Sequence, residues 1–227
     1  MNRMKIDERI IKERKIRAKK VLKILEKLFP NARIALRYKN NWELLVAVEL
    51  SAQCTDKMVN KVTEKLFKKY KTLDDYVKAN PREFETDIRS TGFYRNKTKN
   101  ILSAAKIIKK KYNGRVPDEM EELLTIPGVA RKTANVVLGN AFGKVEGIAV
   151  DTHVKRLAQK LGLTAHSDAN KIEKDLMEIF QKKEWFLLTY RLIEYGRHVC
   201  PARVHDCAGH PLTKIYPRAG MIWPRAK

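Results

Sequence analysis

The sequence predicts an all-α protein, and three observations support this fold class. Apolar residues recur at helical spacing along most of the 227 residues. Residues that commonly cap helices stand at the ends of these periodic stretches. The single strand-like run, residues 147–150, is too short to build a sheet. The pattern gives roughly ten helices, and a chain of this length forms one or two domains.

In the first half of the chain, each predicted helix is bounded by a residue that starts or stops helices. In chain order the segments are 10–28, which ends before Pro30; an apolar-rich stretch over 42–54; 56–67, capped by Thr55 or Asp56; 81–88, opened by Asn80; and a basic helix between Gly92 and Asn113.

The second half shows the same kind of signals, followed by a different tail. The predicted segments are 120–124, opened by Pro117; 131–138, after a tight turn; 152–161, capped by Asp151; a helix capped by Ser167 or Asp168; and 185–199. From Cys200 onward the tail is rich in proline and has no clear period.

The charge balance gives the first indication of function. Lys and Arg total 48 against 26 Asp and Glu, a net charge of +22. Such an excess attracts polyanions and favours nucleic-acid binding, although a lysine-rich proteome would give any protein this character. The sequence shows no apolar run long enough for a membrane span, no signal-peptide core and only three cysteines. We therefore expect a cytoplasmic protein without a disulfide framework.

The most informative stretch is the predicted helix-turn-helix over residues 123–138, with Pro127 and Gly128 in its turn. Free backbone N–H groups at the start of the second helix suit a phosphate, and such a contact is independent of base sequence. Pro-Gly turns are common, however, and a plain connection between two helices explains the same residues.

Two residues near this stretch have chemistry to offer. Lys132 stands two residues into the second helix and carries an amine, which can act as a nucleophile or form a Schiff base. Asp151 follows a short apolar run, and its carboxylate can stabilise a positive charge or assist proton transfer. A solvated lysine and a helix N-cap are the structural alternatives for these two residues.

Three motifs in order resemble the endonuclease III family of helix-hairpin-helix DNA glycosylases. They are Leu50-Ser51-Ala52-Gln53-Cys54-Thr55-Asp56, the hairpin from Ile126 to Asn135, and Val150-Asp151-Thr152-His153. The resemblance runs from about Trp42 to Cys200, most of the chain. It implies two helical domains with a DNA groove between them: residues 34–144 as a helical barrel with the hairpin, and residues 1–33 together with 145–227.

The resemblance also implies roles for individual residues. Lys132 matches the catalytic lysine that attacks the deoxyribose C1′, and Asp151 matches the catalytic aspartate. Gln53 matches the glutamine that enters the duplex near the orphaned base, and Phe93 matches the apolar wedge that fills the gap. The other expected DNA-binding residues are Gly128, Val129, Ala130, Arg131 and His153.

These residues imply a bifunctional DNA glycosylase and AP lyase of base excision repair. It would remove oxidised pyrimidines and cleave the strand 3′ to the abasic site by β-elimination through a lysine imine. The alternatives are another base, such as mispaired thymine or an oxidised purine, or a non-catalytic hairpin protein. The expected partner is double-stranded DNA with damaged bases or abasic sites, bound by a nucleoid-associated monomer without membrane contact.

The chain departs from the family pattern in two places. Ala130 replaces the last glycine of the usual Gly-Val-Gly hairpin, with a small strain cost if its φ is positive. Family members often hold a [4Fe–4S] cluster with four cysteines, but here Cys200, Cys207, His210 and Tyr216 stand at those positions. We therefore expect no cofactor, the site being a remnant; zinc on Cys200, Cys207 and His210, with His205 as fourth ligand, is the alternative.

Overall fold

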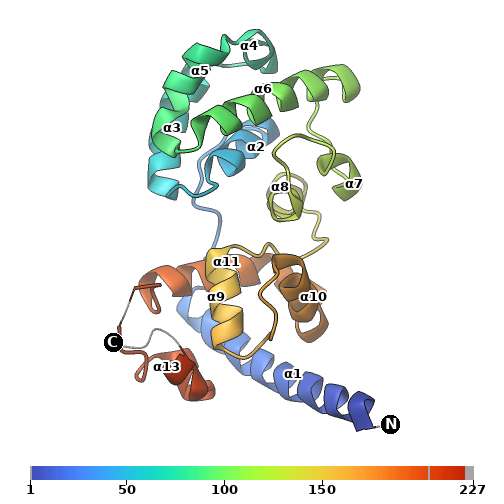
Figure 1. Cartoon of the computed structure of the whole chain (residues 1–227), viewed down its shortest axis with the longest axis vertical. Helices are drawn as coiled ribbons and strands as arrows, with labels where there is room; N and C mark the ends of the chain where they lie inside the picture. Colours follow the sequence, from blue (N-terminus) through green and yellow to red (C-terminus); the bar gives the residue numbers. More distant parts are fainter. Residues whose placement is uncertain (1, 204, 223–227) are drawn as a thin grey trace. The chain divides into compact units, whose positions relative to one another are not determined.

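The computed structural model describes residues 2–203 and 205–222. Within these residues the chain forms thirteen α-helices and one short 3-10 helix, with no β-strand, which confirms the predicted fold class. None of the described helices combines the length and hydropathy required to cross a lipid bilayer. The helices are α1 (Asn2–Leu28), α2 (Asn41–Leu50), α3 (Asp56–Lys69), α4 (Leu73–Lys78), α5 (Pro81–Ile88), η1 (Arg89–Thr91), α6 (Tyr94–Lys111), α7 (Met120–Leu123), α8 (Arg131–Phe142), α9 (Thr152–Lys160), α10 (Ala169–Ile179), α11 (Lys182–His198), α12 (Pro211–Ile215) and α13 (Arg218–Ile222) (Figure 1).

The chain divides into two compact units. Ile34–Glu146 forms one, and Met1–Arg33 together with Gly147–Lys227 forms the other. The first contains α2 to α8, and the second contains α1 and α9 to α13. Each unit has its own apolar core.

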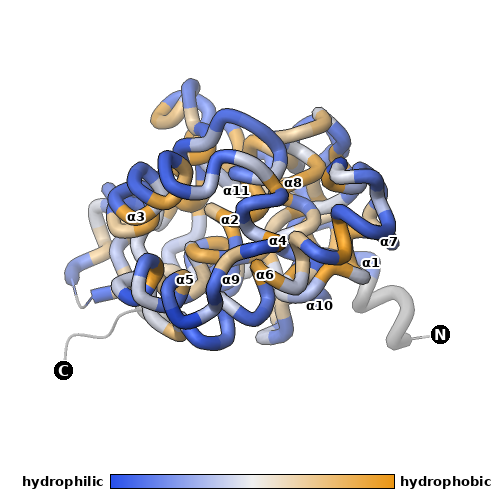
Figure 2. Tube along the Cα trace, turned by 90° about the horizontal axis from the view of Figure 1, so that it is seen from above, coloured by the Kyte–Doolittle hydropathy of each residue, from blue (hydrophilic) through white to orange (hydrophobic). Residues whose placement is uncertain are grey.

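The Ile34–Glu146 unit is built around α2, whose residues from Glu43 to Leu50 are all buried. A helix that is apolar on every side must be enclosed by other elements, and α3, α6 and α8 pack against it. α3 is amphipathic instead, and hydrophobic and hydrophilic residues alternate along it (Figure 2). The core that supports the hairpin contains Leu45, Ala104, Ile108, Val116, Met120, Leu123, Ile126, Val129, Ala134, Val137 and Leu138.

The second unit joins the two ends of the chain. α1 packs against α10, α11 and α12, and α9 packs against α11. Arg17 on α1 donates a hydrogen bond to the Gly162 carbonyl at 2.6 Å and lies 4.0 Å above the Tyr216 ring. The N-terminal helix is thereby attached both to the residues after α9 and to the C-terminal tail.

The helix prediction differs from the structure in three places, one of which is α4, where no helix was predicted. The helix expected to continue to Cys54 ends at Leu50, because Ser51 begins a turn and Gln53 has a left-handed backbone with φ of 53°. The tail from Cys200 onward showed no clear period, and no helix was predicted there, yet it contains α12 and α13. Helices of five residues are too short to show a period of 3.6 in the sequence.

Candidate functional site

The hairpin consists of α7, a turn and α8, and its turn requires glycine at position 128. Gly128 has φ of +85°, and a β-carbon there would lie 2.5 Å from Glu49 Oε2 and 3.0 Å from Asn100 Cβ. The left-handed backbone and the lack of space both exclude a larger residue. The turn therefore rests directly on α2 and α6, which fixes its backbone in place.

Ala130 is the N-cap of α8, and it carries no strain. Its backbone has φ of −88° and ψ of 169°, which any residue adopts easily. The alanine at the last glycine position of the family pattern therefore has no conformational cost. Because alanine has no side-chain acceptor, Ala130 leaves the first N–H groups of α8 to other partners, and an anion is a suitable one.

Glu49 lies beneath this turn and is an unusual buried acid. Only 6% of the residue is exposed, and burial raises the pKa of its carboxyl from an ordinary 4.5 to about 8. Sequence reasoning missed this residue because it reads as part of an apolar helix. A polar residue within a run of buried positions was the only available signal.

We expect Glu49→Gln to stabilise the protein at alkaline pH. Above about pH 4.5 the unfolded chain loses the Glu49 proton, whereas the folded chain keeps it until about pH 8. The stability of the natural protein therefore falls across that window, and the neutral glutamine avoids this loss. The gain in free energy of unfolding should be roughly 1–4 kcal/mol at pH 8.5 and small at pH 5.

Urea unfolding at several pH values measures this effect. Glu64→Gln on the exposed face of α3 is the matched control, because Glu64 forms an exposed ion pair with Lys68. An identical pH dependence in Glu49→Gln and the natural protein would contradict the expectation.

Lys132 is the second residue of α8 and is partly exposed. The six residues that follow it, Thr133 to Leu138, are all buried. Arg131, the first residue of α8, is also partly exposed. The amine of Lys132 is therefore carried on a helix that is firmly anchored in the core, immediately after the tight turn. A primary amine in this position can form an imine with a carbonyl carbon.

Gln53 and Phe93 lie in two loops of the same unit, and both have left-handed backbones. Their φ values are 53° and 47°, and Phe93 is 61% exposed. Residues with a side chain rarely adopt positive φ, because this backbone conformation costs them about 1–3 kcal/mol each. An exposed phenylalanine held at such a cost is a candidate for a ligand contact.

Lys97 ties these two loops together, and the sequence analysis missed it. Its buried Nζ donates hydrogen bonds to the carbonyl oxygens of Leu50 and Thr91, both at 2.8 Å. Leu50 precedes the Gln53 loop and Thr91 precedes Phe93. Burial lowers the pKa of Lys97 from its ordinary value. The signal was its helical spacing with Ile101 and Ala105, which places Lys97 on the buried face of α6.

Asp151 belongs to the other unit and is the N-cap of α9. Its Oδ1 accepts a hydrogen bond from the Val154 N–H at 2.8 Å. The preceding residues Ile148 to Val150 are buried, and the Thr189 hydroxyl donates to the Ala149 carbonyl at 3.2 Å. The carboxylate is thus held rigidly at the start of a helix. Asp151 therefore does cap a helix, as the structural alternative proposed. Its role as an N-cap leaves the carboxylate able to take part in chemistry as well.

His153 packs closely against α11. A β-carbon at Gly196 would lie 2.5 Å from His153 Nδ1, so the imidazole occupies the space that this glycine leaves. The residue has a clear packing role, and its contact with DNA stays a prediction. Lys132 and the hairpin residues lie in the Ile34–Glu146 unit with Gln53 and Phe93, whereas Asp151 and His153 lie in the other.

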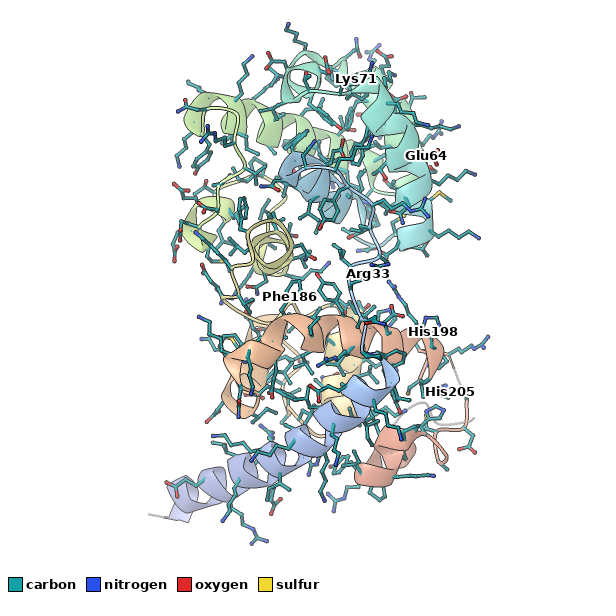
Figure 3. The ribbon with its side chains drawn as sticks, turned by 180° about the vertical axis from the view of Figure 1, so that it is seen from behind. Arg33, Glu64, Lys71, Phe186, His198 and His205 are labelled. Atoms are coloured by element: carbon teal, nitrogen blue, oxygen red, sulfur yellow. The ribbon has the colours of Figure 1, made fainter. Side chains whose placement is uncertain are left out.

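The prediction of an empty remnant site without a cofactor is wrong. Cys200, His205, Cys207 and His210 bring one ligand atom each to a common place, and these four atoms all lie within 4.8 Å of one another. His205 is labelled in Figure 3, in the segment after α11. Such a group of thiols and imidazoles could hold a metal ion. The sequence spacing of the residues did not show that the chain folds them together.

Comparison with known proteins gives consistent results. A family model described as HhH-GPD superfamily base excision DNA repair protein matches residues 46–182. Endonuclease III of Synechocystis sp. is 50% identical over 206 residues, covering 91% of this chain and 94% of the relative. Endonuclease III of Bacillus subtilis is 48% identical over 189 residues, covering 83% and 86%.

Solved structures show the same likeness. A non-covalent endonuclease III–DNA complex matches with a TM-score of 0.86 at 46% identity, over 90% of this chain and 96% of that one. A trapped endonuclease III–DNA covalent intermediate, an estranged-adenine complex, matches with a TM-score of 0.83 at 47% identity, over 87% and 93%. A thermostable thymine-DNA glycosylase shares the fold at 20% identity with a TM-score of 0.76.

Proposed function

The chain belongs to the endonuclease III family, within the HhH-GPD superfamily of base excision DNA repair proteins, and from this membership we propose the roles of its residues. The protein is a DNA glycosylase with AP lyase activity, and its partner is DNA. The observation that carries the proposal is the position of Lys132, on an anchored helix directly after the hairpin turn.

We propose Lys132 as the nucleophile. Its neutral amine attacks C1′ of the deoxyribose, the bond from C1′ to the base breaks, and the base leaves with a proton. The sugar ring opens as the protonated imine forms, which acidifies the C2′ hydrogens. Loss of a C2′ proton breaks the bond from C3′ to oxygen, so the strand is cleaved 3′ to the lesion. Water then hydrolyses the imine and releases the lysine.

Other residues support this reaction in the proposal. Asp151 stabilises the positive charge that develops on the sugar as the base departs, or accepts a proton. The backbone N–H groups at residues 128–131 bind a phosphate, since the start of α8 suits an anion. Gln53 and Phe93 fill the gap that remains when the damaged nucleotide leaves the stack, which lowers the cost of extrusion.

Oxidised pyrimidines are the proposed substrates. The trapped complex of a relative contains an estranged adenine, and adenine is the pairing partner of thymine, which fits a pyrimidine as the extruded base. The substrate is chromosomal DNA, so we propose a nucleoid-associated location in the cytoplasm.

An incision assay on a panel of duplexes tests this substrate class. The duplexes carry thymine glycol opposite adenine, a G·T mismatch, 8-oxoguanine opposite cytosine, an abasic site, or no damage. We expect cleavage of the thymine glycol and abasic duplexes. Faster cleavage of the mismatch or of the 8-oxoguanine duplex would overturn the pyrimidine assignment, and no cleavage of any duplex would overturn the lyase assignment.

We expect Lys97→Met to weaken recognition of damaged DNA selectively. Without the two hydrogen bonds from Lys97, the loops that carry Gln53 and Phe93 lose their common anchor. Affinity for a duplex with an abasic-site analogue should fall about tenfold, equivalent to about 1.4 kcal/mol, while affinity for an intact duplex changes little. Fluorescence anisotropy measures both affinities.

Lys99→Met is the matched control, because Lys99 is exposed on the same helix and its substitution removes the same charge. It should lower both affinities equally and slightly, as the loss of one positive charge does. An unchanged ratio of the two affinities in Lys97→Met would show that Lys97 acts only on stability.

A further inference from the structure

We propose that Cys200, His205, Cys207 and His210 bind a single divalent metal ion in tetrahedral coordination, with zinc as the best fit. The four ligand atoms lie within 4.8 Å of one another, and both cysteines are buried. Two thiolates and two imidazoles form a common ligand set of structural zinc sites. This inference is independent of the proposed catalytic roles, which involve none of these residues.

The distances fit one ion. Zinc bonds of about 2.3 Å to sulfur and 2.0–2.1 Å to nitrogen place the ligand atoms of a tetrahedron roughly 3.3–3.8 Å apart. Cys200 Sγ and Cys207 Sγ are 3.9 Å apart, and Cys207 Sγ and His205 Nε2 are 3.1 Å apart. Small adjustments of the side chains around an ion are sufficient to complete the geometry.

The same distances do not fit an iron–sulfur cluster. A [4Fe–4S] cluster of the ordinary kind takes four thiolates, and the whole chain has three cysteines, of which Cys54 lies in the other unit. In a two-iron cluster with two histidines, the cysteines and histidines bind different irons. Cys207 and His205 are too close together for that arrangement.

The histidines are prepared for a metal. His205 Nδ1 lies 2.7 Å from the Arg203 carbonyl oxygen, so Nδ1 carries the proton and the lone pair of Nε2 faces Cys207. A hydrogen bond from the second ring nitrogen to a backbone carbonyl is typical of metal-binding histidines. Nδ1 of His210 is buried and has no hydrogen-bond partner within the described part of the chain. A metal ion would satisfy such a nitrogen.

The charges around the sulfur atoms complement a thiolate site. The buried Lys160 Nζ lies 2.7 Å from Cys207 Sγ and 3.3 Å from Cys200 Sγ. Arg156 approaches Cys200 from another direction, with Nη1 3.7 Å from Sγ and Nη2 2.6 Å from the carbonyl oxygen. These cations offset the negative charge of the two thiolates that metal binding requires.

The site joins the end of α11, the loop after it and the start of α12. Cys200 follows the end of α11, His205 and Cys207 lie in the loop after it, and His210 is the N-cap of α12. A metal ion at this place closes the loop over residues 200–210 and fixes the start of α12. The cluster position of the family is thus used by a different metal in this chain.

Metal analysis of the untagged full-length protein tests the proposal. We expect about one zinc ion per chain and no inorganic sulfide. Cobalt(II) exchanged into the site should give the visible bands of tetrahedral thiolate coordination, and X-ray absorption should show two sulfur and two nitrogen ligands. A chelator strong enough to remove the metal should lower Tm by at least about 5 °C.

Variants assign the ligands. Cys207→Ser and His210→Asn should each weaken metal binding at least tenfold. Cys54→Ser and His198→Asn are the matched controls, because Cys54 lies outside the cluster and the His198 imidazole contacts Glu194. Both controls should keep a full metal content.

Three results would overturn the proposal. The first is a folded protein isolated without metal, with a Tm that no chelator changes. It would show that Lys160 alone stabilises the two cysteine sulfur atoms without a metal ion. Several irons with sulfide in each chain would show a cluster. Full zinc content in both ligand variants would place the metal elsewhere. If the variants do not fold, the absorption spectra of the natural protein still decide the ligand set.

Discussion

Lys132→Ala is expected to abolish strand cleavage at abasic sites and covalent trapping by borohydride. Removal of the only proposed nucleophile leaves no amine on α8 to form the imine, so cleavage should fall by at least about a thousandfold. Affinity for DNA should stay within about tenfold, because the net charge of +22 spreads phosphate contacts over many residues. Gel analysis of product and of trapped complex measures both effects.

Lys132→Arg separates the nucleophile from the charge. Arginine keeps the positive charge but cannot lose its proton in a protein, so it supplies no neutral amine. It should be as inactive as alanine while binding DNA as well as the natural chain. Lys106→Ala, an exposed lysine on α6, is the control and should keep full activity. Trapping in either Lys132 variant would refute the assignment.

Asp151→Asn is expected to slow base removal by roughly a hundredfold to a thousandfold. Asparagine can still accept the hydrogen bond from the Val154 N–H, so the cap of α9 persists and stability should change little. The lost carboxylate charge no longer stabilises the cationic sugar. Single-turnover release of thymine glycol measures the rate, and thermal unfolding measures the stability.

Asp168→Asn is the matched control for this substitution. Asp168 caps α10 in the same way, with its Oδ1 accepting from the Lys171 N–H at 3.0 Å. The two variants lose the same charge at equivalent helix positions of one unit. Equal rates for both variants would reduce Asp151 to a structural cap.

Local signals in the sequence predicted several of the capped helices, although they missed α4, which begins with a capping box of Thr72 and Asp75. Asn80 with Pro81, Thr55 and Asp168 each stand where a helix begins. The end of α2 at Leu50 was missed, and one of the contacts at that end is the hydrogen bond from the Lys97 amine, 47 residues further along, to the Leu50 carbonyl. No window around Leu50 contains that information.

In the candidate site, too, some residues could be predicted from local sequence and others depend on contacts between distant segments. The motifs placed Lys132, Asp151 and the hairpin, since these depend on neighbouring residues and on the resemblance. The burial of Glu49 and the meeting of the four candidate metal ligands depend on contacts between segments, which sequence spacing alone does not show. The wrong cofactor prediction followed from a count of cysteines, which favoured an empty remnant over the zinc alternative that included His205 and His210.

The left-handed backbones of Gln53 and Phe93 set stability and repair against each other. Glycine adopts positive φ without the cost that a side chain adds, about 1–2 kcal/mol per residue, so glycine at either position would relieve strain. Directed evolution for heat resistance alone would therefore enrich glycine at 53 and 93. The same variants would lose the two side chains proposed to enter the duplex, and only a selection that includes a damaged substrate would retain them.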